Sequence, residues 1–297
     1  MSINCETLSN SNYLDGHLIP FFKMHGCGND FILIDYECLL KKDVDVSVLA
    51  KNICDRNFGI GADGMILFLP SEKADFRMRI INSDGSEAEM CGNGIRCFTH
   101  YIDLKGRMTK KAIEVETLAG IIKPSLIKSE SDEAKVMVNM GSPKLKPVDI
   151  PILGFDGESI VNQELKVEDR TFNITTVSMG NPHCVIFLDD LDNFDFKYWG
   201  EKIEKHSAFP NKTNVEFAKV DDKGNVTVKV WERGCGATLA CGTGACATLV
   251  AGVLNNLIDK KANIHLPGGT LEIELNNDNE LIMIGSSIIV FTGVFGI

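Results

Sequence analysis

Two cysteines stand in the same setting and could act as a pair. Cys91 precedes Gly-Asn-Gly and Cys241 precedes Gly-Thr-Gly, and a helix-compatible segment follows each motif. The unpaired N–H groups and the dipole at a helix start bind anions and favour a thiolate over a thiol. We therefore expect both thiols to have a pKa below the usual value of about 8.5. Each motif predicts a reactive thiol beside a binding place for a carboxylate.

Such a pair suits the inversion of a carbon centre. A thiolate can remove the proton from one face while a thiol delivers a proton to the other. The α-proton of an amino acid is far less acidic than a thiol, and each pKa unit of mismatch costs about 1.4 kcal/mol. One preorganised donor to the developing charge supplies roughly 3 to 4 kcal/mol, so several are needed. The glycines after both cysteines let backbone donors converge on one carboxylate.

The two motifs occupy matching places in an internal repeat. Four features recur in the same order, each 149 to 152 residues later. They are Gly28-Asn29 with Gly180-Asn181, Phe76–Gly85 with Val226–Cys235, Cys91–Gly94 with Cys241–Gly244, and Thr117–Leu126 with Leu266–Leu275. The nearly constant spacing indicates a duplication in which each copy forms one compact unit.

Each copy reads as strand, strand, loop, helix, strand, strand. The predicted helices span Ile95–Leu104 and Ala245–Leu257, and the second is apolar on nearly every face, as is typical of a helix buried within a sheet structure. We therefore predict an α/β (α+β) fold of two pseudosymmetric domains, each a curved or barrel-like, mainly antiparallel sheet around a central helix. Residues 138–151 contain a glycine and three prolines, which interrupt regular structure, so we expect the boundary between the two copies there. The predicted division is a tail at 1–19, an N-terminal domain at 20–140 and a C-terminal domain at 141–284.

Composition excludes several classes of protein. The chain of 297 residues has 30 Lys and Arg against 41 Asp and Glu, a net charge of −11, and no basic cluster, so we expect no nucleic-acid partner. It shows no signal peptide and no apolar run long enough for a membrane span, so we expect a cytoplasmic protein with no membrane partner. There the ten cysteines stay reduced, and without a paired CxxC we expect no metal site. Eight of the ten are assigned mainly to packing.

Five motifs together resemble the diaminopimelate epimerase family. They are FFKMHGCGNDFILID (Phe21–Asp35), NFGIGADG (Asn57–Gly64), INSDGSEAEMCGNGIRC (Ile81–Cys97), VSMGNPHCVIF (Val177–Phe187) and WERGCGATLACGTGACA (Trp231–Ala247). The resemblance implies an isomerase that needs no pyridoxal phosphate or other cofactor and interconverts LL- and meso-diaminopimelate in lysine and peptidoglycan precursor biosynthesis. It also implies two similar domains with the active site in the cleft between them, the first completed by 285–297. The family often dimerises, so a homodimer is a candidate assembly.

The resemblance also assigns residue roles. Cys91 and Cys241 would be the acid/base thiols, flanked and tuned by His183 and Glu232. The residues implied in substrate binding are Asn29, Asn82, Gly92, Asn93, Asn181, Asn214, Glu232, Arg233, Gly242 and Thr243. These types suit a substrate with an amino acid at each end, because arginine and amide N–H groups bind carboxylates while carboxylate and amide oxygens accept from ammonium groups. Structural alternatives stay open: Asn29 and Asn82 as turn formers, His183 as a core residue, and Glu232 with Arg233 as a solvated pair.

Departures from the family pattern leave further readings open. Cys235 and Ala237-Thr238 stand where relatives often have Ala and Gly-Glu, and Gly64 stands where some carry glutamine. One alternative function is a cofactor-independent racemase of another amino acid, such as histidine or proline. A second is a thiol redox or metal-binding protein, which would need a reversible disulfide or a bound metal for activity.

Overall fold

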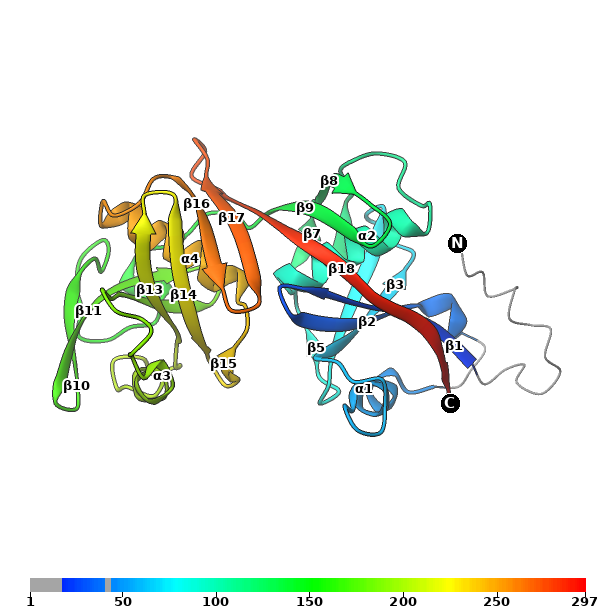
Figure 1. The fold of residues 1–297 in the computed structure, drawn as a ribbon, viewed down its shortest axis with the longest axis horizontal. Helices are drawn as coiled ribbons and strands as arrows, with labels where there is room; N and C mark the ends of the chain where they lie inside the picture. The colour runs from blue at the N-terminus through cyan, green and yellow to red at the C-terminus, as the bar shows by residue number, and fades with distance from the viewer. Residues whose placement is uncertain (1–17, 41–43) are drawn as a thin grey trace. The chain divides into compact units, whose positions relative to one another are not determined.

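The computed structural model describes residues 18–40 and 44–297 (Figure 1). The chain divides into two compact units. Unit 1 consists of the chain up to Val138 together with the C-terminal segment Gly285–Ile297, and unit 2 consists of Asn139–Ile284. The tail predicted at 1–19 lies outside the described residues except for Leu18 and Ile19, which begin the first strand.

Unit 1 contains short strands and two α-helices. Its strands are β1 (Leu18–Gly26), β2 (Asn29–Asp35), β3 (Gly64–Leu69), β4 (Phe76–Asn82), β5 (Glu87–Ala88), β6 (Val115–Thr117), β7 (Gly120–Ile122), β8 (Ser125–Ser129) and β9 (Glu133–Asn139). Its helices are α1 (Val46–Cys54) and α2 (Gly92–Leu104), with a 3-10 turn at Tyr36–Cys38.

From its second strand onward, unit 2 repeats the strand and α-helix order of unit 1. Its strands are β10 (Gln163–Val167), β11 (Arg170–Ser178), β12 (Pro182–Phe187), β13 (Asn214–Asp222), β14 (Asn225–Glu232), β15 (Gly236–Thr238), β16 (Lys261–Leu266) and β17 (Gly269–Leu275). Its helices are α3 (Phe196–Glu204) and α4 (Gly242–Leu254), with a 3-10 turn at Pro147–Asp149. The last strand, β18 (Leu281–Gly296), pairs with β17 through its first residues and with β1 through its later ones.

Strand pairing follows the same plan in both units. Most pairs are antiparallel, but β2 runs parallel to β3 and β4 to β6 in unit 1, as β12 does to β13 and β14 to β16 in unit 2. The registers also correspond, since Phe31 lies opposite Gly64 and His183 opposite Asn214. The two copies can therefore be compared residue by residue.

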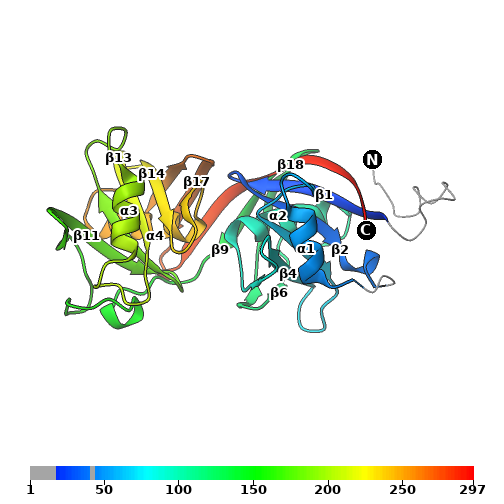
Figure 2. The same ribbon diagram turned by 90° about the horizontal axis from the view of Figure 1, so that it is seen from below.

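A buried helix packs against several strands in each unit (Figures 1 and 2). Helix α2 contacts β1, β2, β3, β4 and β8, and α4 contacts β11, β12, β13, β16 and β17. Every residue from Gly244 to Gly252 is buried, in keeping with the apolar sequence of α4. Both helices begin three residues earlier than predicted, at Gly92 and Gly242, because the preceding cysteine caps each of them.

Helices α1 and α3 were not predicted, because the sequence pattern indicated only one helix in each copy. Each connects two parallel neighbours, α1 between β2 and β3 and α3 between β12 and β13. Parallel neighbours need a crossover connection, for which a helix is the usual solution. Asp45 and Asp195 cap the two helices with their side chains.

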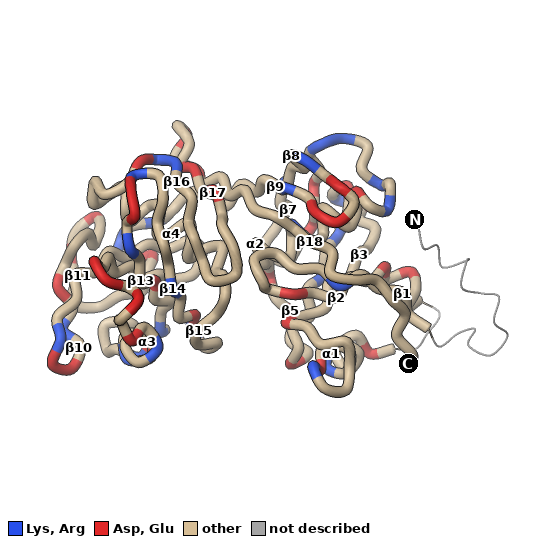
Figure 3. The backbone as a smooth tube through the Cα atoms, in the orientation of Figure 1, with Lys and Arg blue, Asp and Glu red and all other residues tan. Residues whose placement is uncertain are grey.

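Charged residues of both signs are interspersed along the two units (Figure 3). In the part of the chain that the structure describes, no helix is long and apolar enough to cross a membrane.

Candidate active site

The two matched cysteines have the same local structure. Cys91 caps α2, and its sulfur accepts the N–H of Gly94 at 3.4 Å. Cys241 caps α4, and its sulfur accepts the N–H of Gly244 at 3.3 Å. Both cysteines have extended backbone, while the glycines that follow form the first helical turn. Each sulfur therefore lies at the positive end of a helix dipole, as the sequence predicted.

In unit 1, two of the predicted site residues, Asn29 and Asn93, meet at Cys91. The Cys91 sulfur lies 3.5 Å from Asn29 Oδ1, which also accepts from Asn93 Nδ2 at 3.2 Å. The Asn29 amide nitrogen donates to Asp63 Oδ2 at 2.7 Å, so Asp63 sets the orientation of this amide. Arg56 in turn bridges Asp63 and Asp30, at 2.8 Å from each carboxylate. Asn29 is thus part of a hydrogen-bond network and not only a turn former.

Arg96 organises the first turn of α2 from inside the protein. Its side chain is fully buried, and its guanidinium donates to Asn93 Oδ1 at 2.9 Å and to the Gly92 carbonyl at 3.0 Å. It also donates to the Ser286 carbonyl of β18 at 3.1 Å. Arg96 was not predicted as a functional residue, although it lies within the motif Ile81–Cys97. A single arginine in a helix is normally exposed to solvent, so its burial could not be expected from the sequence.

In unit 2, a longer chain of hydrogen bonds ends on Cys241. The Thr243 hydroxyl lies 3.4 Å from the Cys241 sulfur and accepts from Asn181 Nδ2 at 3.3 Å. Asn181 Oδ1 lies 3.0 Å from His183 Nε2, and His183 Nδ1 lies 2.7 Å from Glu216 Oε1. His183 is therefore a buried core residue, which was the structural alternative, but it is also linked to the Cys241 thiol by hydrogen bonds through Asn181 and Thr243. Glu216 was not among the predicted residues.

The pKa expected for Cys241 from its helix position is wrong in direction. Burial raises the pKa of the Cys241 thiol well above its usual range, and the carboxyl groups of Glu232 and Glu216 raise it further. Hydrogen bonds from Thr243 and Gly244 act in the opposite direction but do not overcome these effects. Desolvation of the thiolate is the largest of these effects on the Cys241 pKa. Cys241 is therefore a thiol at neutral pH and can donate a proton.

Glu232 and its neighbours form the other side of this thiol. Burial raises the pKa of Glu232, although the Thr238 hydroxyl donates to it at 2.5 Å. Asn214 Oδ1 accepts a hydrogen bond from the backbone N–H of Arg233 at 2.9 Å, and Asn214 Nδ2 donates to the Pro182 carbonyl at 2.8 Å. The exposed Arg233 guanidinium donates to the Asn211 carbonyl at 3.3 Å. Glu232 and Arg233 are therefore not paired with each other.

Two predicted residues are placed differently from the others. Asn82 ends β4 and donates to Ser86 Oγ at 3.0 Å, within a turn and not to the Cys91 cluster. The half-buried Gly242 lies against Met283, whose sulfur would be 3.2 Å from an added Cβ. A side chain at Gly242 would therefore crowd the start of α4.

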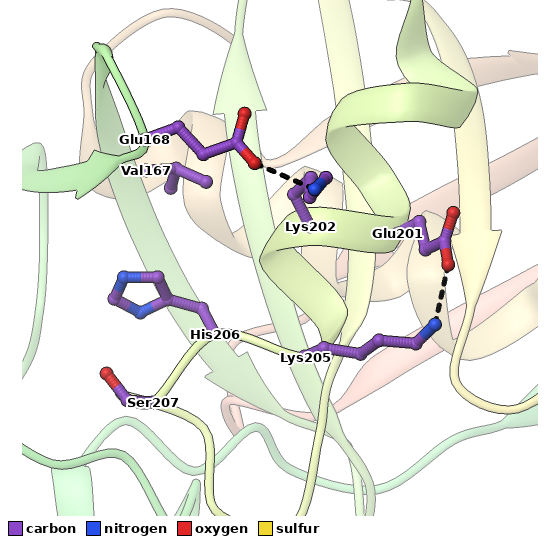
Figure 4. Close-up of a pocket in the computed structure, with 7 residues that line it drawn as sticks. All are labelled: Val167, Glu168, Glu201, Lys202, Lys205, His206 and Ser207. Carbon is purple, nitrogen blue, oxygen red and sulfur yellow. Dashed lines mark hydrogen bonds and ion pairs between the residues drawn. The ribbon is translucent and has the colours of Figure 1, made fainter.

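A pocket of about 470 Å³ lies elsewhere in unit 2 (Figure 4). Its lining residues are Val167, Glu168, Glu201, Lys202, Lys205, His206 and Ser207. The charges there are paired, Glu168 with Lys202 at 2.7 Å and Glu201 with Lys205 at 2.6 Å. None of the predicted site residues lines this pocket. Across residues 18–40 and 44–297, no group of three or more His, Cys, Asp and Glu side chains could hold a metal ion.

Comparison with known proteins decides the family. A family model described as "Diaminopimelate epimerase" matches residues 21–146 and 175–290. The chain is 51% identical over 273 residues to a diaminopimelate epimerase of Desulfitobacterium hafniense, with 92% of this chain and 96% of the relative covered. The chain belongs to the diaminopimelate epimerase family. A second member, from Carboxydothermus hydrogenoformans, is 52% identical over 93% of this chain and 99% of its own length. Membership confirms the predicted resemblance and makes the chain an isomerase.

Solved structures confirm the predicted fold class. A PhzF-family phenazine biosynthesis protein from Bacillus anthracis superposes with a TM-score of 0.67 at 17% identity, covering 94% of this chain and 99% of its own. A hydroxyproline epimerase from Agrobacterium vitis gives a TM-score of 0.65 at 13% identity, covering 95% and 93%. At these identities the likeness concerns the fold alone. This chain therefore shares its fold with proteins of other names.

Proposed function

We propose that this chain epimerises LL-2,6-diaminopimelate to meso-diaminopimelate with Cys91 and Cys241 as its acid/base thiols and without pyridoxal phosphate or another cofactor. The observation that carries the proposal is the matched geometry of the two thiols, each capping a buried helix in its own unit and receiving a glycine N–H. The sequence relatives supply the substrate. The reaction would serve lysine and peptidoglycan precursor biosynthesis in the cytoplasm, where thiols remain reduced.

In the proposed mechanism the two thiols act on opposite faces of one α-carbon. The Cys91 thiolate removes the α-proton, the C–H bond breaks, and its electron pair stays on the carbon and the adjacent carboxylate. The Cys241 thiol then gives its proton to the other face, which leaves Cys241 as the thiolate and Cys91 as the thiol. The raised pKa of Cys241 supports its role as the proton donor in this direction. Gly244 N–H and the Thr243 hydroxyl stabilise the thiolate that forms.

Substrate binding is proposed for the polar groups around the thiols. The helix starts at Gly92-Asn93 and Gly242-Thr243 offer backbone donors for the carboxylate beside the reacting carbon. The exposed Arg233 can bind the distal carboxylate through two N–H groups. The remaining polar residues proposed to bind ammonium and carboxylate groups are Asn29, Asn82, Asn181, Asn214 and Glu232. His183 and Glu232 are proposed to tune the Cys241 thiol.

The function is tested by turnover of purified protein under reducing conditions with no cofactor added. LL-diaminopimelate should yield the meso isomer, and dialysis against a chelator should leave the rate unchanged. Histidine and proline serve as control substrates. Conversion of either one in place of diaminopimelate would select a racemase of another amino acid. A strict need for a metal or a disulfide would select the redox or metal-binding alternative.

We also propose that the chain forms a homodimer through the end of β18. Four large apolar side chains are exposed there, Val290, Phe291, Val294 and Ile297, at 40% to 53% of their surface. Exposed apolar residues gathered on one short segment are typical of an interface. The family resemblance supports the same assembly.

A further inference from the structure

The two copies differ in what supports the thiol-bearing helix. Register places Ile66 of β3 opposite Leu33, and Glu216 of β13 opposite Val185, so Ile66 and Glu216 occupy corresponding positions. Phe31 corresponds in the same way to His183. The N-terminal copy thus has an apolar pair where the C-terminal copy has two ionisable groups. The difference lies beside the thiol-bearing helices, because a Cβ added to Gly94 would meet Ile66 and one added to Gly244 would meet Glu216.

Glu216 lies against the first turn of α4. A Cβ added to Gly244 would lie 2.7 Å from Glu216 Oε1 and 3.3 Å from the Cys241 sulfur. In unit 1, a Cβ added to Gly94 would lie 3.2 Å from Ile66 Cδ1 instead. The Glu216 side chain is fully buried, and within the described residues its second oxygen makes no hydrogen bond. Burying a carboxyl oxygen that makes no hydrogen bond lowers the stability of the fold, so Glu216 calls for an explanation other than stability.

The hydrogen bonds of His183 fix where its protons lie. Nε2 lies 3.0 Å from Asn181 Oδ1, which only accepts, so Nε2 carries a proton. Nδ1 lies 2.7 Å from Glu216 Oε1, and two lone pairs cannot face each other at this distance, so a proton lies between these atoms as well. The pair therefore holds two protons and is neutral overall, whichever partner holds the shared one.

The direction of the remaining bonds follows from these protons. Because Asn181 Oδ1 accepts from His183, the Asn181 NH₂ group donates to Thr243 Oγ1 at 3.3 Å. Thr243 then has its own hydroxyl proton available for the Cys241 sulfur, 3.4 Å away. The three hydrogen bonds from His183 onward thus point toward the sulfur. In unit 1 the order is reversed when Cys91 is a thiol, since Asn29 then accepts from the Cys91 sulfur and donates to Asp63.

We propose that Glu216 is a positioning residue for Cys241: it fixes the ring protons of His183 and thereby directs the Asn181 and Thr243 hydrogen bonds onto the sulfur. This role rests on the proposed two-thiol function and deepens it, because it gives the Cys241 thiol a chain of directed hydrogen bonds. The charged groups that surround the site are Glu232 from β14 and Glu216 itself from β13, with His183 from β12. Cys184 is also close to Glu216, whose charge adds to the effect of burial in raising the Cys184 pKa.

The test compares two replacements of Glu216. Glu216→Gln keeps the size and can donate an amide proton to His183 Nδ1, which leaves Nε2 as the donor but removes the carboxylate charge. Glu216→Leu cannot fix the ring protons. The pH dependence of modification by methyl methanethiosulfonate, followed by peptide mass spectrometry, reports the titration of Cys241 and Cys91 separately and needs no substrate. Asp35→Asn, which removes another buried carboxylate in unit 1, is the matched control.

We expect the Cys241 midpoint to be about one pH unit higher in Glu216→Leu than in Glu216→Gln, because both variants lack the carboxylate and only the leucine variant loses the directed hydrogen bonds, while the Cys91 midpoint stays constant in both. Turnover should stay within about tenfold of wild type in Glu216→Gln and fall by about 100-fold in Glu216→Leu. Equal Cys241 midpoints in the two variants, or equal losses of turnover, would overturn the proposal. If Glu216→Leu does not fold, Glu216→Met, which also cannot fix the ring protons, takes its place. Failure of the wild type to turn over diaminopimelate would instead overturn the proposed function, and the midpoint shift would still be measured.

Discussion

At the scale of single residues, Thr243 is the last donor before the Cys241 sulfur. Its hydroxyl accepts from Asn181 and lies 3.4 Å from the sulfur. Thr243→Val keeps the shape but removes this donor from the thiolate that forms during turnover. We expect kcat to fall by about tenfold or more and the Cys241 pKa to rise further, because the hydroxyl lowers it. Thr243→Ser should restore both values, as measured by turnover and thiol modification; failure of serine to rescue would show that the methyl group matters instead.

The residues that the sequence predicted are those that its repeats and motifs mark. Cys91 and Cys241 were found because the duplication preserves them with their glycines, and the structure places both at helix starts. Glu216 could not be found in this way. It lies between Val215 and Phe217 in a strand whose first five residues are all buried, so no alternation of polar and apolar residues distinguishes it. The raised Cys241 pKa was equally hidden, since burial at a helix start is a tertiary property.

At the scale of elements, the first turns of α2 and α4 give a matched pair of glycine substitutions. Gly244→Ala would place a methyl group 2.7 Å from a carboxyl oxygen of Glu216, whereas Gly94→Ala would meet the end of the Ile66 side chain at 3.2 Å. A methyl carbon can shift more readily than a carboxyl held by His183. We expect Gly244→Ala to lose at least tenfold more turnover than Gly94→Ala while both remain folded by circular dichroism. Equal losses would contradict the assigned asymmetry.

The strand β2 in unit 1 carries a charge network that should govern acid stability. Burial alone would raise the pKa of Asp30, but hydrogen bonds from Arg56 and Lys23 outweigh it and lower the pKa from 3.8 to about 2. A lowered carboxyl pKa stabilises the fold above the unfolded value and loses this contribution as pH falls from about 4 to 2. Asp30→Asn should cost about 2 kcal/mol at neutral pH. Urea titrations at pH 7 and pH 3 check this, and an equal deficit at both pH values would refute it.

The sequence predicted the helix whose residues are strongly apolar, but it did not predict the helices that are required only because they connect parallel strands. The apolar run in α4 was sufficient to predict a buried helix. Helices α1 and α3 are short and were overlooked, because the parallel pairing of β2 with β3 and of β12 with β13 is not visible in either strand. Once that pairing is known, a crossover helix is the natural expectation.

At the scale of the whole molecule, the end of β18 allows the proposed homodimer to be tested. Val294→Asp places a charge among the exposed apolar side chains of Val290, Phe291 and Ile297. Light scattering during size-exclusion chromatography should give a dimer for the wild type and a monomer for the variant. Leu153→Asp, at an exposed leucine of unit 2, is the control and should remain dimeric. A monomeric wild type at micromolar concentration would contradict the proposal.

The duplication explains why one chain can supply two different acid/base groups. The copies share their strand pairing and their capped helices, yet the C-terminal copy has His183, Glu216 and Glu232 where the first has Phe31, Ile66 and Asn82. These replacements surround Cys241 with ionisable groups. The two copies thus share one framework but surround their thiols differently, which is consistent with the proposed role of Cys241 as the proton donor.

The most direct test of the two-thiol account is exchange of the α-proton in D₂O. Wild type, Cys91→Ala and Cys241→Ala are each incubated with LL-diaminopimelate, and deuterium at the α-carbon and formation of the meso isomer are followed by NMR and chiral chromatography. The account predicts a meso product carrying solvent deuterium with the wild type and loss of epimerisation by at least about 100-fold in each folded variant. Near-normal epimerisation by either variant would contradict it.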